Sequence, residues 1–406
     1  MAFATGIAQQ LRIAKESVWG TAPGAGTGRL VRRKTCDIAT EKESYQSAEL
    51  LPHYQLADLR HGQVSSKGTL TAEPVPGGHS DLIASALRKA FLTGAATGAI
   101  TTVTAAASAP HFVRSGGSFL TDGFKIGDVV RWTGWSTTGT ANNARNYIIT
   151  ALTATQMTVV DPGSTTGTVA AKTSGDSVTC SVTGKKSWIP TTGHTDESYA
   201  IERFSADVSQ SMLFLGVKVG GFSAKFSAGA MGDLSIPLMG AGYTNAAAAY
   251  FTSPTAVSST SVLAGANAGM LVAGGAVAYV RELGVTLDNG LSSVPVIGTN
   301  AVQGIVQGPM KVTGNLTAYF QDATMRDYFL NETEVSLIFA AFTGSAGNAD
   351  FMQFCMPRVK FQSIGIPDAP GVIAMPLQFQ ALYNGSGGSG QSSEQTTLSV
   401  QDSLAA

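Results

Sequence analysis

Apolar and polar residues alternate along several short stretches of this chain, which is the pattern of a β-strand with one buried face. Residues 312–320 alternate Val, Gly, Leu, Ala and Phe with Thr, Asn and Tyr, and residues 375–383 repeat this pattern near the C-terminus. Within residues 217–226 the apolar positions change sides at Gly220-Gly221, which predicts a β-bulge or a bend. The chain is therefore expected to be mainly β.

Helical patterns are few, and two of them indicate an internal repeat. Ser80 is a candidate N-cap for an amphipathic helix reaching residue 91, and Asp322 for a shorter helix. Gly-Thr-Leu-Thr-Ala at 68–72 precedes the first helix, and Gly-Asn-Leu-Thr-Ala at 314–318 precedes the second. The recurrence of a strand followed by a capped helix favours an internal duplication over a chance match.

Residues 94–186 differ in character from the flanking sequence. They are rich in Thr, Ala, Gly and Ser, with short strand candidates such as residues 127–132. We expect a small β domain inserted in a loop of the first half. The predicted organisation is residues 1–93 as the first part of the main unit, then the insertion. Residues 187–406 would hold the remainder, with the second repeat and a C-terminal arm that follows a Gly/Ser linker at 384–391.

Composition favours a protein that assembles with other subunits. Hydrophobic residues make up 44% of the chain and charged residues 13%, about half the usual charged share. A chain so poor in charge is expected to cover much of its surface in subunit contacts; a Gly/Ala/Ser/Thr-rich secreted β protein is the alternative.

Charge also limits the kind of contact expected with nucleic acid. Lysine plus arginine number 26 against 27 acidic residues, a net charge of -1, whereas proteins that grip nucleic acid show a basic excess or stripe. The densest basic cluster, at 29–34, is too short to wrap a duplex and is typical of a solvated strand edge. If DNA meets this protein, it is expected to pass without being held.

Targeting and redox signals are weak. Cys36, Cys180 and Cys355 are far apart and odd in number, which favours folding in a reducing cytoplasm over a disulfide scaffold. The N-terminus lacks the pattern of a signal peptide. Residues 263–280 have the length of a membrane span, but they are mostly Ala and Gly and are expected to form loop and buried strand.

The usual catalytic and ligand motifs are not recognisable. The glycines at 24, 26 and 28 are not followed by the Lys-Ser/Thr of a phosphate loop. Gln391 stands where a nucleophile elbow around Ser389 needs glycine. Asp288-Asn289-Gly290 lacks the later acidic ligands of a calcium loop and is typical of a hairpin turn. We expect no enzyme, no cofactor and no metal; an undetected hydrolase is the remote alternative.

Several segments, in their order and spacing, resemble the major tail tube protein family of long-tailed, non-contractile bacteriophages. Val18 stands where the family often has threonine. The insertion resembles a small β domain of phage structural proteins through the sequence Phe-Lys-Ile-Gly-Asp-Val-Val at 124–130. The segments that carry the main resemblance are 16–23, 44–49, 60–62, 67–72, 198–203, 214–219, 284–287, 312–320 and 356–360.

The resemblance implies a tail-tube β-sandwich or barrel, duplicated, with short flanking helices and an inserted outer β domain. Its inner sheet would join neighbouring copies into one barrel, which removes exposed strand edges. The implied partners are further copies, in stacked homotrimeric pseudo-sixfold or homohexameric rings, with tape measure and tail terminator proteins. Double-stranded DNA would pass through a near-neutral or acidic lumen without specific binding. The implied location is the virion tail, assembled in the host cytoplasm, with no membrane.

Residues 41–62 are the predicted main stacking loop between rings, with a floppy surface loop as the alternative. The candidate contact residues are Tyr45, Glu49, His53, Tyr54 and Arg60. Other functions remain open: a baseplate or decoration protein of a phage, or a bacterial surface β protein.

Overall fold

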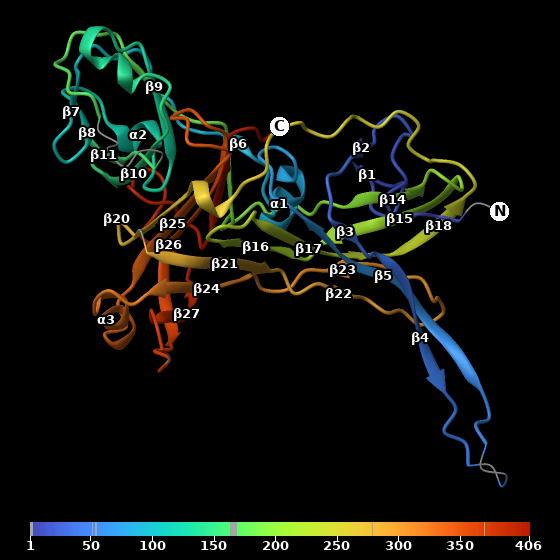
Figure 1. Cartoon of the computed structure of the whole chain (residues 1–406). Helices are drawn as coiled ribbons and strands as arrows, with labels where there is room; N and C mark the ends of the chain where they lie inside the picture. Colours follow the sequence, from blue (N-terminus) through green and yellow to red (C-terminus); the bar gives the residue numbers. More distant parts are fainter. Residues whose placement is uncertain (1–2, 51, 53–54, 163–168, 278, 369) are drawn as a thin grey trace.

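The chain forms an elongated body of β-sheets with a long projecting hairpin and a small domain at one end (Figure 1). The computed structural model describes residues 3–50, 52, 55–162, 169–277, 279–368 and 370–406. The prediction of a mainly β fold with few short helices is confirmed.

The first repeat builds two sheets that share a long strand. The outer sheet has the order β2–β1–β14–β15–β18, and the inner sheet pairs β4 with β5, β5 with β17, and β17 with β15 and β16. Its elements are β1 (Gln9–Lys15), β2 (Arg29–Leu30), β3 (Thr35–Cys36), β4 (Ala39–Gln46), β5 (Leu59–Ala72), α1 (Ser80–Leu87), β14 (Tyr199–Ser205), β15 (Gln210–Val219), β16 (Gly221–Ser227), β17 (Asp233–Gly240) and β18 (Gly242–Ala246).

The second repeat reproduces these pairings strand for strand. In the outer sheet, β19–β25 corresponds to β1–β14, β19–β20 to β1–β2, β25–β26 to β14–β15, and β26–β28 to β15–β18. In the inner sheet, β21–β24 corresponds to the pairing of β3 and β4 with β5, and β24–β27 corresponds to β5–β17. Its elements are β19 (Ala268–Val272), β20 (Gly275–Ala276), β21 (Val280–Asp288), β22 (Ser292–Ser293), β23 (Ile305–Val306), β24 (Lys311–Tyr319), α3 (Thr324–Leu330), β25 (Val335–Phe342), β26 (Phe351–Ile364), β27 (Ala374–Ala381) and β28 (Ser399–Asp402).

Bulges fall at matching places in the two repeats. The β14–β15 register shifts between Tyr199 and Ile201, and the β25–β26 register shifts between Val335 and Leu337. The change of apolar face predicted at Gly220-Gly221 is the break between β15 and β16, and β26 has a register shift against β27 at the corresponding position, after Phe361. Because bulges are deliberate features of a sheet rather than defects, their repetition supports the duplication strongly.

The two helices follow corresponding strands, although their caps differ from the sequence prediction. Ser80 is the first helical residue of α1 rather than its cap, and the helix ends early because Arg88 adopts a left-handed φ of 58°. In α3 the N-cap is Ala323 rather than Asp322, and it has no side-chain cap. Asp322 lies one residue earlier, where its side chain accepts a hydrogen bond from the Thr324 backbone N–H (2.8 Å). Both helices contribute to one hydrophobic core that spans the two repeats.

One inner sheet runs through both repeats, because β16 pairs with β21 from Gly221↔Asp288 to Ser227↔Glu282. The resulting strand order is β4–β5–β17–β16–β21–β24–β27–β26. The core and α1 cover one face of this sheet; α1 lies above β16 and β17 in Figure 1. Asp288-Asn289-Gly290, expected as a tight hairpin turn, instead opens a longer excursion that contains β22 and β23.

Residues 94–184, which we call the inserted domain, include a six-stranded sheet with its own aromatic core around Trp132. Lys185 and Lys186, which the sequence assigned to the insertion, belong to the next strand of the main body. The chain enters and leaves it through β6 (Leu92–Thr93) and β13 (Lys185–Trp188), which pair with each other and belong to the main body. Its elements are β7 (Val103–Ala106), β8 (His111–Arg114), α2 (Phe119–Asp122), β9 (Val129–Thr133), β10 (Tyr147–Leu152), β11 (Gln156–Val160) and β12 (Thr179–Val182).

Candidate assembly surfaces

The β4–β5 hairpin projects far from the body as an arm, which we define as residues 41–62 (Figure 1). The sequence predicted a loop here, but the part of the arm next to the body is paired strand, from Glu41↔Ser65 to Gln46↔Leu59. The side chains of β4 are exposed along most of its length. A hairpin this exposed buries little apolar surface of its own, and a two-stranded hairpin alone is marginally stable in water.

Two of the predicted contact residues face each other across the arm. Tyr45 on β4 is opposite Arg60 on β5, and the Tyr45 ring is 57% exposed. Gly62 leaves room for this ring, since a Cβ there would be 2.2 Å from it. Arg60 Nε donates to Asp58 Oδ2 (2.8 Å) and Tyr45 Oη to Glu43 Oε2 (2.6 Å).

Of the other predicted contacts, the structure describes Glu49, in the connection between β4 and β5. Glu49 is exposed, and its backbone N–H donates to Ser47 Oγ (3.3 Å). His53 and Tyr54 lie outside the described residues.

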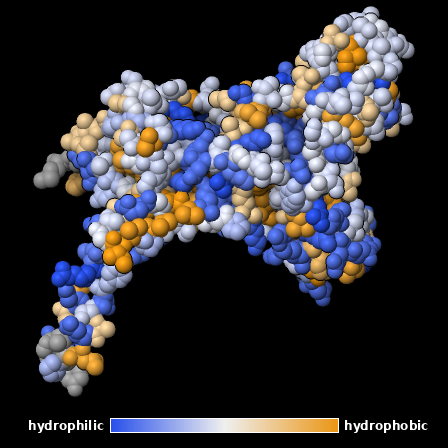
Figure 2. All heavy atoms as spheres, turned by 180° about the vertical axis from the view of Figure 1, so that it is seen from behind, coloured by the Kyte–Doolittle hydropathy of each residue, from blue (hydrophilic) through white to orange (hydrophobic). Residues whose placement is uncertain are grey.

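The second repeat has a counterpart of the arm, which the sequence did not reveal. The connection between β21 and β24, residues 289–310, corresponds in the strand register to the arm but lies along the arm's base. There Val64 N–H donates to the Asn300 carbonyl (2.8 Å), and Ser293 Oγ donates to Gln63 Oε1 (3.3 Å). Figure 2 shows apolar surface where the arm leaves the body. Exposed apolar side chains of this connection are Val294, Val296, Ile297 and Val306.

The face of the inner sheet opposite the core carries a continuous row of polar side chains. Each member is the register partner of the next, so the row crosses the sheet from β3 to β26. Two hydroxyl pairs within it are in hydrogen-bond contact, Thr35–Thr71 (2.5 Å) and Ser223–Thr286 (2.9 Å). The row consists of Thr35, Thr71, Ser235, Ser223, Thr286, Thr313, Gln380 and Lys360.

Three lysines on or beside this face contact acidic neighbours. Lys67 lies 3.5 Å from Glu41, and Lys225 lies 3.0 Å from Glu282 on the adjacent strand. Lys34 likewise contacts Asp233 (2.5 Å). Such exposed pairs add little stability, but they offset the positive charge of these three lysines.

The basic cluster at 29–34 is bonded within the chain rather than forming a freely solvated edge. Arg29 pairs with Asp81 (2.5 Å), and Arg32 Nη1 and Arg33 Nη2 donate to the carbonyls of Thr260 (2.7 Å) and Gln9 (2.5 Å). These arginines hold neighbouring segments together.

The inserted domain sits on the second repeat through an apolar contact and a buried polar network. Val129 and Ile148 of the domain pack against Leu271, Ile338 and Phe351. Gln401 of β28 bonds both backbone groups of Val129: its Oε1 accepts from the N–H (2.9 Å) and its Nε2 donates to the carbonyl (2.8 Å).

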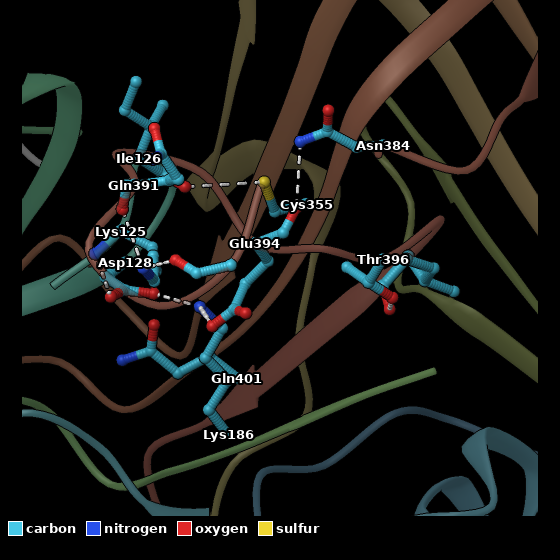
Figure 3. Close-up of polar contacts among 12 residues, drawn as sticks. Lys125, Ile126, Asp128, Lys186, Cys355, Asn384, Gln391, Glu394, Thr396 and Gln401 are labelled. Atoms are coloured by element: carbon cyan, nitrogen blue, oxygen red, sulfur yellow. Dashed lines mark hydrogen bonds and ion pairs between the residues drawn. The ribbon is translucent and has the colours of Figure 1, made fainter. Parts of the chain in front are cut away.

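Charged groups complete this contact (Figure 3). Lys186 forms ion pairs with Asp128 and with Glu394 (3.2 Å). Burial alone would lower the pKa of Lys186, but the two carboxylates outweigh it and raise that pKa. Lys125 Nζ donates to the carbonyls of Gly388 (2.5 Å) and Gln391 (2.7 Å). The segment 384–391, expected to be a Gly/Ser linker, is therefore held against the inserted domain by hydrogen bonds.

The three cysteines of the chain are buried. Burial raises the pKa of the thiols of Cys36, Cys180 and Cys355, the last to about 12. Among the described residues no group of His, Cys, Asp and Glu has the arrangement of a metal site. None of the helices in the described part of the chain has the length and apolar character needed to cross a membrane.

The described residues thus form a duplicated β-sandwich with an exposed arm and a polar sheet face. A family model described as phage tail tube protein matches residues 6–381, nearly the whole chain. The chain belongs to the phage tail tube protein family. No curated protein matches it. Membership makes it a structural protein of the virion tail that assembles into a tube.

Proposed function

We propose that this protein polymerises as stacked rings to form the tail tube of a long-tailed, non-contractile phage, and that the tube conducts DNA during ejection. The observation that carries the proposal is the inner sheet, which is continuous through two repeats and has one face turned away from the core. A sheet of this kind becomes a hollow cylinder when copies add to its edges, since closure removes those edges.

The polar face of the inner sheet is the proposed lumen. Cation contacts with phosphate add to retention, with affinity falling steeply as salt rises. Hydroxyl and amide side chains, with lysines already paired to acids, offer few such contacts. DNA would therefore slide through without specific binding.

The arm is the proposed contact between rings. It exposes an aromatic ring at Tyr45 and a charged group at Arg60 on paired strands, and a further charged group at Glu49 beyond the end of β4, which together provide both apolar area and polar complementarity. The apolar surface at its base would receive part of the adjacent ring. This makes residues 41–62 a stacking arm, with Tyr45, Glu49 and Arg60 as proposed contacts.

The division of the chain follows from this arrangement as a proposal. Residues 1–93 and 185–406 would form the tube, and residues 94–184 an outer decoration, because a channel for duplex DNA has no room for such a domain. The proposed further partners are the tape measure and tail terminator proteins, and assembly would take place in the host cytoplasm.

Electron microscopy of the purified full chain tests the proposal. Long tubes with a central channel, built of stacked rings, are the expected result. Antibodies against the inserted domain are expected to decorate the outside of the virion tail along its length. Particles labelled only at the baseplate or on the capsid would overturn the proposal in favour of another phage structural role.

A further inference from the structure

The inner sheet ends in two strands that have a partner on one side only. β3 and β4 pair with β5 and with no other described strand. β26 pairs with β25 only as far as Val359, although its pairing with β27 continues to Ile364. Gly365 extends this pairing, since its N–H donates to the Pro376 carbonyl (2.9 Å). Residues 363–367 therefore have one open edge.

The junction between the two repeats shows how such edges join. There residues 221–226 of the first repeat pair with residues 283–288 of the second repeat. By the shared strand pairings, the first of these segments corresponds to residues 363–368, and the second corresponds to residues 36–41. Residues 35–41 of the first repeat and residues 363–367 of the second repeat have no such pairing within the described part of the chain. Each of the two kinds of strand edge that meet at the junction is thus present twice in the chain, but only one pair of these edges is joined.

The junction also supplies a register for the missing contact. Ser223 is opposite Thr286 there, and Ala224 is opposite Val285. The pairings with β17 and β27 show which residue of β26 corresponds to each residue of β16, and the pairings with β5 and β24 do the same for β3, β4 and β21. On this basis Gly365 of one copy would lie opposite Ala39 of the next, and Ile366 opposite Ile38. The same transfer places Ser363 opposite Glu41.

The direction of the backbone groups agrees with this register. Asp37 and Gly365 both direct their N–H groups inward, to Thr69 and Pro376 of the same chain. Because successive residues of a strand direct their backbone groups to opposite sides, Ile38 and Ile366 direct theirs to the open edges. In the single chain the Ile38 carbonyl accepts from the Arg203 side chain (2.7 Å), and Ile366 is 49% exposed.

We propose, building on the tube function above, that β26 of one copy pairs with β3 and β4 of the next in this register, and that three copies close the ring. The occupant of each open edge is a second copy of this chain, because the β16–β21 junction already shows both halves of the contact fitting together.

The number of copies follows from barrel geometry. Thr35 and Thr286 lie on one polar row, but the counterpart of Thr35 in the second repeat is Glu282, four residues away. A stagger of four residues for every four strands equals that of an eight-stranded barrel of shear 8, with strands tilted about 36°. Three copies then give a barrel about 45 Å across between backbones. Two copies would give about 30 Å, too narrow for a duplex once side chains line it, and six about 90 Å.

Engineered cysteines test the proposed register directly. The double variant Ala39→Cys, Gly365→Cys is assembled under reducing conditions, imaged by electron microscopy, then oxidised and run on a non-reducing gel. The control is Ser223→Cys, Thr286→Cys, which places the same pair at the junction inside one chain. The native thiols are buried and give little background.

Covalent dimers and trimers, with nothing larger, are expected from the first variant, and monomers with an internal disulfide from the control. Because a Cβ at position 365 would lie 3.0 Å from Pro376 Cγ, Glu41→Cys, Ser363→Cys serves as a second pair with the same expectation. Tubes without cross-links in either pair, or a ladder reaching six chains, would overturn this inference while leaving the tube function standing. Absence of tubes from the unmodified chain would overturn both.

Discussion

At the scale of single residues, the duplication is recorded most clearly in backbone irregularities. Gly221 has a φ of +136°, and a Cβ there would lie 2.0 Å from the Leu287 carbonyl oxygen. The second repeat forms the corresponding bend without glycine, through a register shift between Phe361 and Ser363. The sequence pair Gly220-Gly221 predicted the first bend because glycine tolerates such conformations. Nothing comparable in the sequence marked the second.

Asp402 ties the end of the second repeat to the turn before α1 and gives stability a dependence on pH. Both its carboxylate oxygens accept from the Gly77 N–H (3.0 and 2.9 Å), and burial raises its pKa to about 6. The folded chain therefore holds this proton more tightly than the unfolded chain, whose carboxyl has a pKa near 3.8. The contribution of this group to stability is greatest below about pH 4 and declines as pH rises to about 6.

We expect Asp402→Asn to remove this part of the pH dependence, a change on the order of 2 kcal/mol between pH 4 and 7. The amide oxygen can still accept from Gly77. Urea unfolding of both proteins across this range measures the difference, with Asp207→Asn, on the exposed surface, as the control. A variant that keeps the full slope would show that Asp402 is not its source.

At the scale of elements, local patterns predicted strands and helices better than they predicted their partners. The matching five-residue sequences at 68–72 and 314–318 do occupy corresponding strands, with Leu70 and Leu316 in the core. The pairs β1–β2 and β19–β20 also correspond, yet their sequences share no comparable motif. Their equivalence depends on pairing between residues far apart in the chain, which periodicity does not report.

The arm shows the same limit. Its alternation is weak because neither face of β4 is buried, so the sequence predicted a loop rather than a hairpin. The contact residues Tyr45 and Arg60 come together across the arm only because the two strands pair.

Shortening the arm separates folding from stacking. Replacing residues 47–58 with Asn-Gly connects Gln46 and Leu59, which lie opposite each other on β4 and β5, by a two-residue hairpin turn. We expect an unchanged melting temperature, since the arm is exposed, but rings that no longer stack into long tubes in electron micrographs. An equal-length Gly/Ser replacement is the control that separates reach from side-chain contacts. Tubes of normal length after the deletion would remove the arm from the account of stacking.

At the scale of the whole molecule, the low charge noted in the sequence corresponds to a polar row on the inner sheet in which few side chains are charged. The polar row on the inner sheet is made largely of hydroxyl and amide side chains, and neighbouring lysines are paired with acids. The family resemblance predicted a near-neutral lining, but which residues would form it depended on the pairing of distant strands. The proposed lumen is therefore a property of the assembled sheet rather than of any one motif.

Adding cationic side chains to this face is expected to slow the passage of DNA through the tube. Thr286→Arg adds one positive charge per chain in the middle of the row, repeated in every ring of the tube. Each new phosphate contact strengthens retention, so we expect slower ejection from phages carrying the variant, and partial recovery as salt is raised. Thr286→Gln, which adds length without charge, is the control. Equal ejection rates for the two variants at low salt would argue against an electrostatic role for the lining.

The most direct test of the central claim is a high-resolution reconstruction of the tail tube by electron cryomicroscopy. The account predicts one continuous β-barrel in each ring, made from the inner sheets of neighbouring copies, with the polar row facing the channel and the inserted domains outside. A tube wall in which the inner sheets of separate copies remain unjoined, or in which the polar row faces away from the channel, would contradict it.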